Sequence, residues 1–206
     1  MGNLLTKRIF LAVNLPAEIK NNLGELQSDL KNSFPDESGE YVAKWVIPEN
    51  LHITMLFVGE ISQEKIEKVT RITQECVLGW KKFEVKIDQI CYGPAKLIPP
   101  RFIWARVVKN MDLECLSKML SQKINEQGIL HQVDNRGFSP HITLARIKEW
   151  VWKKIEPEER PNIETEMDLS FQVQSIDLME SVLKRSGSEY KLLQEFKMLS
   201  TVDRLS

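Results

Sequence analysis

The chain has 206 residues, with 28 lysines and arginines, 29 aspartates and glutamates, a formal net charge of −1 and 42% hydrophobic residues. These values are typical of a globular protein and exclude intrinsic disorder, collagen-like repeats and a small disulfide scaffold. No apolar run reaches the roughly 18 residues of a transmembrane helix, so we expect no membrane contact. The balanced charge argues against binding long nucleic acid by bulk electrostatics. It is compatible with a compact contact to one phosphate or to one strand end.

The three cysteines, Cys76, Cys91 and Cys115, are odd in number and widely spaced. This pattern argues against a zinc site and against a disulfide framework, and it favours reduced thiols in a cytoplasmic protein. The first residues lack the apolar segment of a secretory signal. They do fit the short myristoylation pattern that begins at Gly2, and the sequence does not decide whether Gly2 is modified.

Hydrophobic periodicity predicts alternating strands and helices in the first part of the chain. Strands are predicted where apolar residues are continuous or alternate with polar ones, at 9–13, 51–58, 83–87 and 101–108. Helices are predicted where apolar residues recur every three or four positions, at 17–31 and 62–78. Gly59 should end the second strand, and the Ser62 hydroxyl can cap the second helix.

A similar order follows in the second part. A helix should run from about Leu113 to Gly128, which suits a helix C-terminus. The remaining elements are a strand, a short helix and two further strands, at 140–146, 147–156, 169–183 and 190–199. The order predicts a duplicated unit whose halves meet near Lys109, and because no flexible linker separates them, we expect the halves to pack together.

Two of the three histidines have nearly the same sequence context. His52 follows Pro48 and begins His-Ile-Thr-Met, whereas His141 follows Pro140 and begins His-Ile-Thr-Leu. Each motif falls on a predicted strand, and the repetition supports a duplicated unit. His131 lacks this context and is expected in a loop or on the surface.

Strand geometry places an imidazole beside a hydroxyl in both motifs. Residues i and i+2 of a strand point to the same face, so His52 shares a face with Thr54, and His141 shares one with Thr143. The apolar residues between them should point into the core. If an approximate two-fold axis relates the halves, the two imidazole–hydroxyl pairs can face each other.

Two imidazoles around one central space suit phosphodiester cleavage. Near neutral pH one imidazole can be neutral and take a proton from water, while the other is protonated and donates to the departing oxygen. Attack and departure are roughly in line, so the two should stand on opposite sides of phosphorus. The threonine hydroxyls can bind the non-bridging oxygens. No acidic cluster has the spacing of metal ligands, so we expect neither a metal nor a cofactor.

Several segments together make the chain similar to the 2H phosphoesterase superfamily, and most of all to its RNA 2′,3′-cyclic phosphodiesterase (2′-5′ RNA ligase-like) branch. These segments lie at 8–13, 48–54, 100–104, 140–146 and 179–183. The resemblance covers nearly the whole chain, so it implies one α+β domain over 1–206. It further implies a bilobal, pseudo-two-fold duplicated unit in which two mainly antiparallel sheets line a central cleft, with helices outside.

The resemblance also implies an activity and roles for single residues. The activity is metal-independent hydrolysis of RNA or nucleoside 2′,3′-cyclic phosphate ends to 2′-phosphates. By analogy His52 donates the proton to the 3′ oxygen, His141 is the base that activates water, and Thr54 and Thr143 bind the phosphate. Arg146 matches the arginine that closes the second motif. It lies five positions after His141, so it would face away in an unbroken strand, and a bulge or strand end would be needed to turn it back.

Other readings remain open at this point. The same motifs are compatible with a 2′-5′ RNA ligase that joins a cyclic-phosphate end to a 5′-hydroxyl, with action on small cyclic nucleotides or 2′-5′ linked oligonucleotides, and with a non-catalytic module that binds nucleotides or RNA ends. We expect RNA ends or small nucleotides as partners and a monomeric chain. The physiological RNA and its base preference are not decided by the sequence.

A few further residues could take part in binding. Aromatic side chains near the motifs could stack on a terminal base or pack beneath the strands. They are Trp45, Tyr92 and Phe138. The basic segment around Trp150 and Trp152 could track RNA, although such runs are usually solvated faces. Arg101 is either a solvated flank of its strand or a phosphate contact.

Overall fold

The computed structural model describes residues 6–34, 42–95, 97–130, 137–184 and 187–199, and Gly2 and His131 lie outside these ranges. The described strands are β1 Thr6–Asn14, β2 Ala43–Trp45, β3 His52–Ser62, β4 Phe83–Gly93, β5 Phe102–Val107, β6 His141–Ile147, β7 Thr165–Val173, β8 Ser175–Lys184 and β9 Gly187–Lys197. The α-helices are α1 Ala17–Asn32, α2 Gln63–Val77, α3 Met111–Glu126 and α4 Glu149–Trp152, and short 3₁₀ helices cover Pro48–Asn50 and Pro157–Glu159.

The helix starts follow from local side-chain chemistry. The Ser62 hydroxyl accepts a hydrogen bond from the Lys65 amide at the start of α2, and the Asn110 side-chain oxygen accepts one from the Leu113 amide at the start of α3. These bonds satisfy amides that have no partner within the helix. The three long predicted helices are confirmed. The short fourth helix starts later than predicted because β6 continues to Ile147, and it already ends at Trp152.

Several strand predictions were wrong in their limits, and two of these differences follow from how the strands pair. Gly59 does not end β3: it adopts a φ of 95° next to a bulge, and the strand continues to Ser62. Glycine suits this place because a positive φ carries no steric cost for it. The run predicted as one strand at 169–183 is two strands that separate at Gln174, because β7 pairs with β4 whereas β8 pairs with β1 on the other side of the sheet.

The fold class is confirmed as α+β, and the strands form one sheet in the order β7-β4-β5-β6-β3-β1-β8-β9, with β2 also paired to β6. Every described strand pair in it is antiparallel. The two expected sheets are thus two groups of strands, β7-β4-β5-β6 and β3-β1-β8-β9, joined by the single residue pair Ile53–Ile142. The expected boundary near Lys109 does not separate these groups, since β4 and β5 precede it and pair with strands that follow it.

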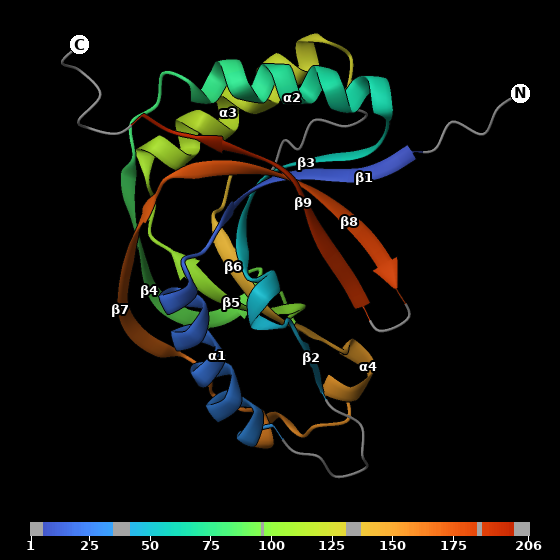
Figure 1. Cartoon of the computed structure of the whole chain (residues 1–206). Helices are drawn as coiled ribbons and strands as arrows, with labels where there is room; N and C mark the ends of the chain where they lie inside the picture. Colours follow the sequence, from blue (N-terminus) through green and yellow to red (C-terminus); the bar gives the residue numbers. More distant parts are fainter. Residues whose placement is uncertain (1–5, 35–41, 96, 131–136, 185–186, 200–206) are drawn as a thin grey trace, which may run out of the picture.

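The main core lies between the helices and one face of this sheet. It includes Ile53 and Met55 of β3, Ile142 and Leu144 of β6, and the buried stripes of α1, α2 and α3. Figure 1 shows α2 and α3 together at one end of the molecule and α1 at the other. Within the described residues no helix is long and apolar enough to cross a membrane.

Candidate functional site

The two His-Ile-Thr strands lie side by side at the centre of the sheet. β3 and β6 pair through Ile53 and Ile142, which are both fully buried in the main core. The histidine and threonine on either side of each isoleucine therefore point to the opposite face. In the register set by this pair, His52 comes across from Thr143 and His141 across from Thr54. The structure thus brings together the four residues that the repeated motif singled out.

His52 is held in one orientation by its neighbours. Its Nδ1 lies 2.7 Å from the Asn50 carbonyl oxygen, and its Nε2 lies 3.1 Å from the Thr54 hydroxyl oxygen. A carbonyl oxygen can only accept, so in the neutral ring Nδ1 carries the proton and Nε2 keeps its lone pair. The rings of Phe10 and Tyr190 pack against the imidazole, with centroids 5.1 and 5.2 Å away.

His141 is held in the equivalent way. Its Nδ1 lies 2.8 Å from the Ser139 carbonyl oxygen, so its Nε2 is also left as the proton acceptor. The indole of Trp104 stacks on the imidazole, with centroids 3.9 Å apart and planes 24° from parallel. The indole in turn lies directly over Gly93 of β4: a Cβ atom there would be 2.2 Å from its Cδ2. Only glycine leaves room for the ring at this place.

Burial shifts both imidazoles towards the neutral form. Burial lowers the pKa of His52 and of His141 below the ordinary histidine value, while the Asn50 and Ser139 carbonyls partly oppose the shift. The positive charges of Lys20 and of His141 lower the pKa of His52 further, which places the two rings within electrostatic reach of each other. Both rings are therefore proton acceptors at neutral pH, and a bound phosphate anion would raise both pKa values again.

A bulge in β6 brings Arg146 to the same face as the histidines. Thr143 pairs with Trp104 and Ala145 with Ile103, so Leu144 is an extra residue that interrupts the alternation. The exposed Arg146 guanidinium consequently lies 4.9 Å from the centre of the Phe102 ring. Phe102 stacks on Trp104, which stacks on His141. β6 is therefore not an unbroken strand, and its bulge places Arg146 near the site.

β3 has the same irregularity, and it exposes a residue that the sequence analysis missed. Thr54 pairs with Ala12 and Leu56 with Leu11, so Met55 is the extra residue. Phe57 follows, 68% exposed and with its ring 6.2 Å from that of Phe10. It lies five positions after His52, as Arg146 lies five after His141. Extending the comparison of the two motifs by two residues would have found it.

A polar cluster beside His52 was also missed. Asn14 pairs with His52 across β1 and β3, and its side-chain amide donates to the buried Asp177 carboxylate of β8. The Ser175 hydroxyl donates to the same carboxylate at 3.2 Å. Burial raises the pKa of Asp177 above its ordinary value despite these bonds. No short motif marks this cluster, because its members come from strands that are far apart in the sequence.

The weaker candidates mostly have structural surroundings. Trp45 packs edge-on against Phe34 beneath a lysine, and the Tyr92 hydroxyl donates to the Pro161 carbonyl at 2.7 Å. Phe138 packs against the main core and Trp152 is buried. Arg101 is exposed at the start of β5. Trp150 is half exposed beside the ammonium of Lys154.

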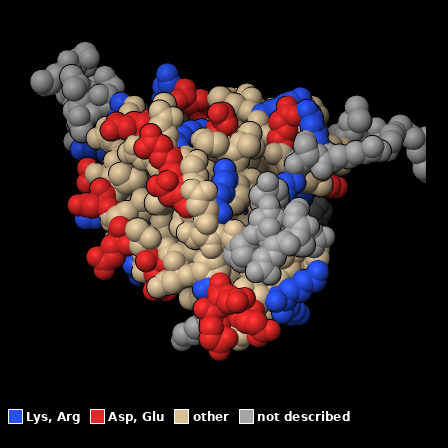
Figure 2. Space-filling view, turned by 90° about the horizontal axis from the view of Figure 1, so that it is seen from below, with Lys and Arg blue, Asp and Glu red and all other residues tan. Residues whose placement is uncertain are grey.

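Two further observations concern the charged side chains of the molecule. The face of the molecule in Figure 2 carries basic and acidic side chains side by side, with wide uncharged areas between them. Such a surface does not favour contact with a long nucleic acid over that with a single charged group. Among the described residues, no three or more His, Cys, Asp or Glu side chains gather in a way that could hold a metal ion.

The chain is similar in sequence and in fold to known proteins. The family model for LigT-like phosphoesterases matches residues 13–104. An RNA 2′,3′-cyclic phosphodiesterase of Thermotoga maritima is 30% identical over 91% of this chain and 94% of its own length. The chain belongs to the LigT-like phosphoesterase family. A solved structure from Thermus thermophilus matches this LigT-like phosphoesterase with a TM-score of 0.76 and 26% identity, over 93% of this chain and 97% of the other. Escherichia coli LigT in its apo form matches with a TM-score of 0.72 and 25% identity, over 94% of this chain and 98% of the other.

Proposed function

We propose that the chain hydrolyses RNA or nucleoside 2′,3′-cyclic phosphate ends to 2′-phosphates by acid–base catalysis with two histidines. One observation carries this proposal. Two imidazoles lie on one face of neighbouring strands, and each is fixed through Nδ1 by a backbone carbonyl so that Nε2 is available for proton transfer. The names of the relatives support the choice of substrate.

The reaction balances with these side chains alone. Nε2 of His141 takes a proton from water as the water oxygen attacks phosphorus. The bond from phosphorus to the 3′ oxygen breaks, and protonated His52 donates its Nε2 proton to that oxygen. The products are a 2′-phosphate and a free 3′-hydroxyl. His52 ends neutral and His141 protonated, and exchange with solvent restores both. No step as written requires a metal ion.

The remaining polar groups fit the phosphate oxygens. Thr54 and Thr143 present hydroxyls on the face that carries the imidazoles, and Arg146 extends a guanidinium towards the same face. Hydrogen bonds from these groups strengthen as negative charge grows on the non-bridging oxygens, so they stabilise the transition state more than the ground state. The anionic phosphate also favours the protonated form of His52 that the mechanism needs.

The wider setting is part of the same proposal. We infer that residues 1–206 act as one monomeric domain in the cytoplasm, on RNA ends or small nucleotides. Free thiols at Cys76, Cys91 and Cys115 support a reducing compartment. A site that needs one phosphate and two proton-transfer groups has no requirement for a second chain.

The deciding experiment is product analysis on a labelled RNA with a 2′,3′-cyclic phosphate end, with a 5′-hydroxyl RNA present and EDTA added. We expect a 2′-phosphate end, no joined product and full activity in EDTA. A joined product would favour a ligase, and tight binding without turnover would favour a binding module. Loss of activity on chelation would contradict the two-histidine mechanism.

A further inference from the structure

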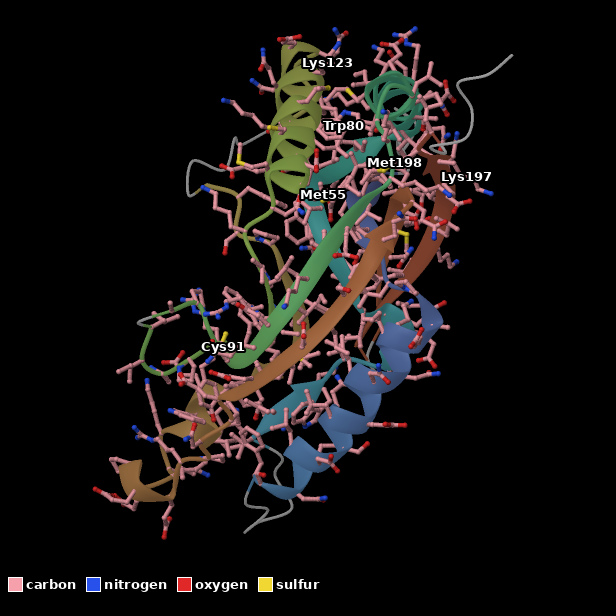
Figure 3. All side chains as sticks on the ribbon, turned by 90° about the vertical axis from the view of Figure 1, so that its left-hand side faces the viewer. Met55, Trp80, Cys91, Lys123, Lys197 and Met198 are labelled. Carbon is pink, nitrogen blue, oxygen red and sulfur yellow. The ribbon has the colours of Figure 1, made fainter. Side chains whose placement is uncertain are left out.

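The bulges at Leu144 and Met55 are each held from the helix side by a buried polar side chain. The Gln27 amide of α1 donates to the Leu144 carbonyl at 2.9 Å and to the Val46 carbonyl at 2.8 Å. The Ser117 hydroxyl of α3 donates to the Met55 carbonyl at 2.8 Å. Met55 lies where β3 passes α3 (Figure 3). Equivalent carbonyls of the two motif strands thus receive a hydrogen bond from two different helices.

Both contacts require the burial of a polar side chain, which does not by itself stabilise the fold. Gln27 is 2% exposed and Ser117 is 6% exposed, and both stand on helix faces that are otherwise apolar. A buried polar side chain lowers the free energy of unfolding unless it is fully hydrogen-bonded, and an apolar side chain of the same shape is often as stable. General packing therefore does not require an amide at position 27 or a hydroxyl at position 117.

The bulge decides which side chains join the site. The extra residue at Leu144 reverses the strand alternation, so that Arg146 points to the histidine face. If the extra residue moved along β6, the residues between its old and new places would exchange faces. The Leu144 carbonyl also accepts the Val46 amide at 2.8 Å, so Gln27 ties the bulge to β2 and α1 together.

We propose that Gln27 is a positioning residue that fixes the bulge at Leu144 and thereby directs Arg146 to the phosphate. Ser117 has the corresponding role for the bulge at Met55, which places Phe57 beside Phe10. The catalytic effect of this proposal rests on the proposed function, because it requires Arg146 to act on the substrate. The effect on the backbone does not, since it concerns only the conformation of β6.

The test is a double-mutant cycle between Gln27→Met and Arg146→Ala in the full chain, with hydrolysis of a nucleoside 2′,3′-cyclic phosphate as the readout. Methionine keeps the length and volume of the side chain but cannot donate. Loss of a charged hydrogen bond corresponds to a fall of about 10- to 100-fold in kcat/KM. We expect Gln27→Met to cause a fall of that order alone, and less than about twofold once Arg146 is alanine. Equal falls in both backgrounds would overturn the proposal.

A second readout keeps the two proposals apart. Backbone amide NMR signals of Ala145 and Arg146 should shift or broaden in Gln27→Met, whereas the pH profile of kcat/KM should keep its shape because the imidazoles are held by other groups. Unchanged amide signals would overturn the positioning role. Changed signals together with an active Arg146→Ala variant would support the positioning of the backbone and refute the part of Arg146 in catalysis.

Matched variants control for loss of a buried polar group. Thr73 is fully buried, and among the described residues its hydroxyl bonds only within α2, to the Val69 carbonyl at 2.8 Å. Thr73→Val should therefore change stability and leave kcat/KM unaltered. Should Gln27→Met not fold, Ser117→Ala removes a single oxygen and tests the equivalent bulge against Phe57→Ala. Ser117→Thr keeps the hydroxyl and should retain activity. Additive losses of Ser117→Ala and Phe57→Ala would contradict the shared mechanism.

Discussion

Gly93→Ala should disable the site from a neighbouring strand. The added methyl carbon would lie 2.2 Å from Cδ2 and 2.3 Å from Cε3 of Trp104. Carbon atoms in ordinary contact are about 3.5–4.0 Å apart, so the indole would have to retreat by roughly 1.3 Å or more. Trp104 stacks on His141 at 3.9 Å, and the imidazole would lose the surface that holds its plane.

The size of the effect follows from this displacement. Misplacing a catalytic group by about 1 Å can cost about 100-fold in rate, which corresponds to about 2.7 kcal/mol in transition-state stabilisation. Overfilling a packed site also lowers the free energy of unfolding by about 1–3 kcal/mol. We therefore expect kcat/KM to fall about 100-fold while the protein remains folded at 25 °C.

Steady-state hydrolysis of a nucleoside 2′,3′-cyclic phosphate, alongside urea unfolding, measures both effects. Gly79→Ala is the matched control, because a methyl group there meets nothing within 4 Å and should change neither quantity. Combining Gly93→Ala with Trp104→Leu should cost no more than Trp104→Leu alone, since the smaller side chain leaves room. If Gly93→Ala keeps kcat/KM within about twofold of the unmodified chain, Trp104 does not position His141 and our reasoning is wrong.

Other outcomes can be measured with the same assays. His52→Ala and His141→Ala should each lower kcat about 100- to 10,000-fold with unchanged circular dichroism, and a variant that keeps most of its activity would remove that residue from the mechanism. Because burial lowers the pKa of both histidines, the acid limb of the pH profile of kcat/KM should have its midpoint below the ordinary histidine pKa of about 6.5. Below about pH 6.5 the unfolded chain therefore binds more protons than the folded chain. The free energy of unfolding should fall as the pH drops from about 6.5 towards the folded-state pKa values of the two histidines, and urea unfolding should show a weaker fall for His52→Ala than for the unmodified chain. Burial raises the pKa of Asp177, so the stability it contributes exists below about pH 3.9 and is lost as the pH rises through its folded-state pKa. Asp177→Asn should consequently raise the Tm at pH 7 and change it little at pH 3, and a lower Tm at pH 7 would show that the carboxylate is needed in charged form.

Local sequence pattern accounts for most helices and strands and for the choice of the first four candidate site residues. Helical spacing of apolar residues located the long helices, and the repeated His-Ile-Thr motif located His52 and His141 together with their threonines. This worked because each of these features depends on neighbours within a few positions. The face of Arg146 could not be found in this way. It depends on one extra residue at Leu144, which is held by a side chain far away in the sequence.

The other features could not be predicted because they depend on pairing between strands that are far apart in the sequence. The split at Gln174 was missed because both sides of it are equally apolar and differ only in which strand they pair with. Trp104 was missed for a similar reason, since its place against His141 depends on a glycine in β4. The grouping of β8 and β9 with β1 and β3 places Tyr190 beside His52, and no pattern near either residue indicates this contact.

One strand group is inserted along the chain between the two parts of the other, and this has a consequence for how the enzyme is synthesised. β1 and β3 from the beginning of the chain share their group with β8 and β9 from its end, while β4, β5, β6 and β7 make up the other. The first group is therefore not one continuous stretch of the chain, because the second group, which spans residues 83–173, lies between its two parts. The Tyr190 ring that packs on His52 belongs to β9, which follows every other described strand along the chain. Turnover should therefore begin only when synthesis has passed β9, and cutting the chain in two should yield fragments that are inactive unless they reassemble.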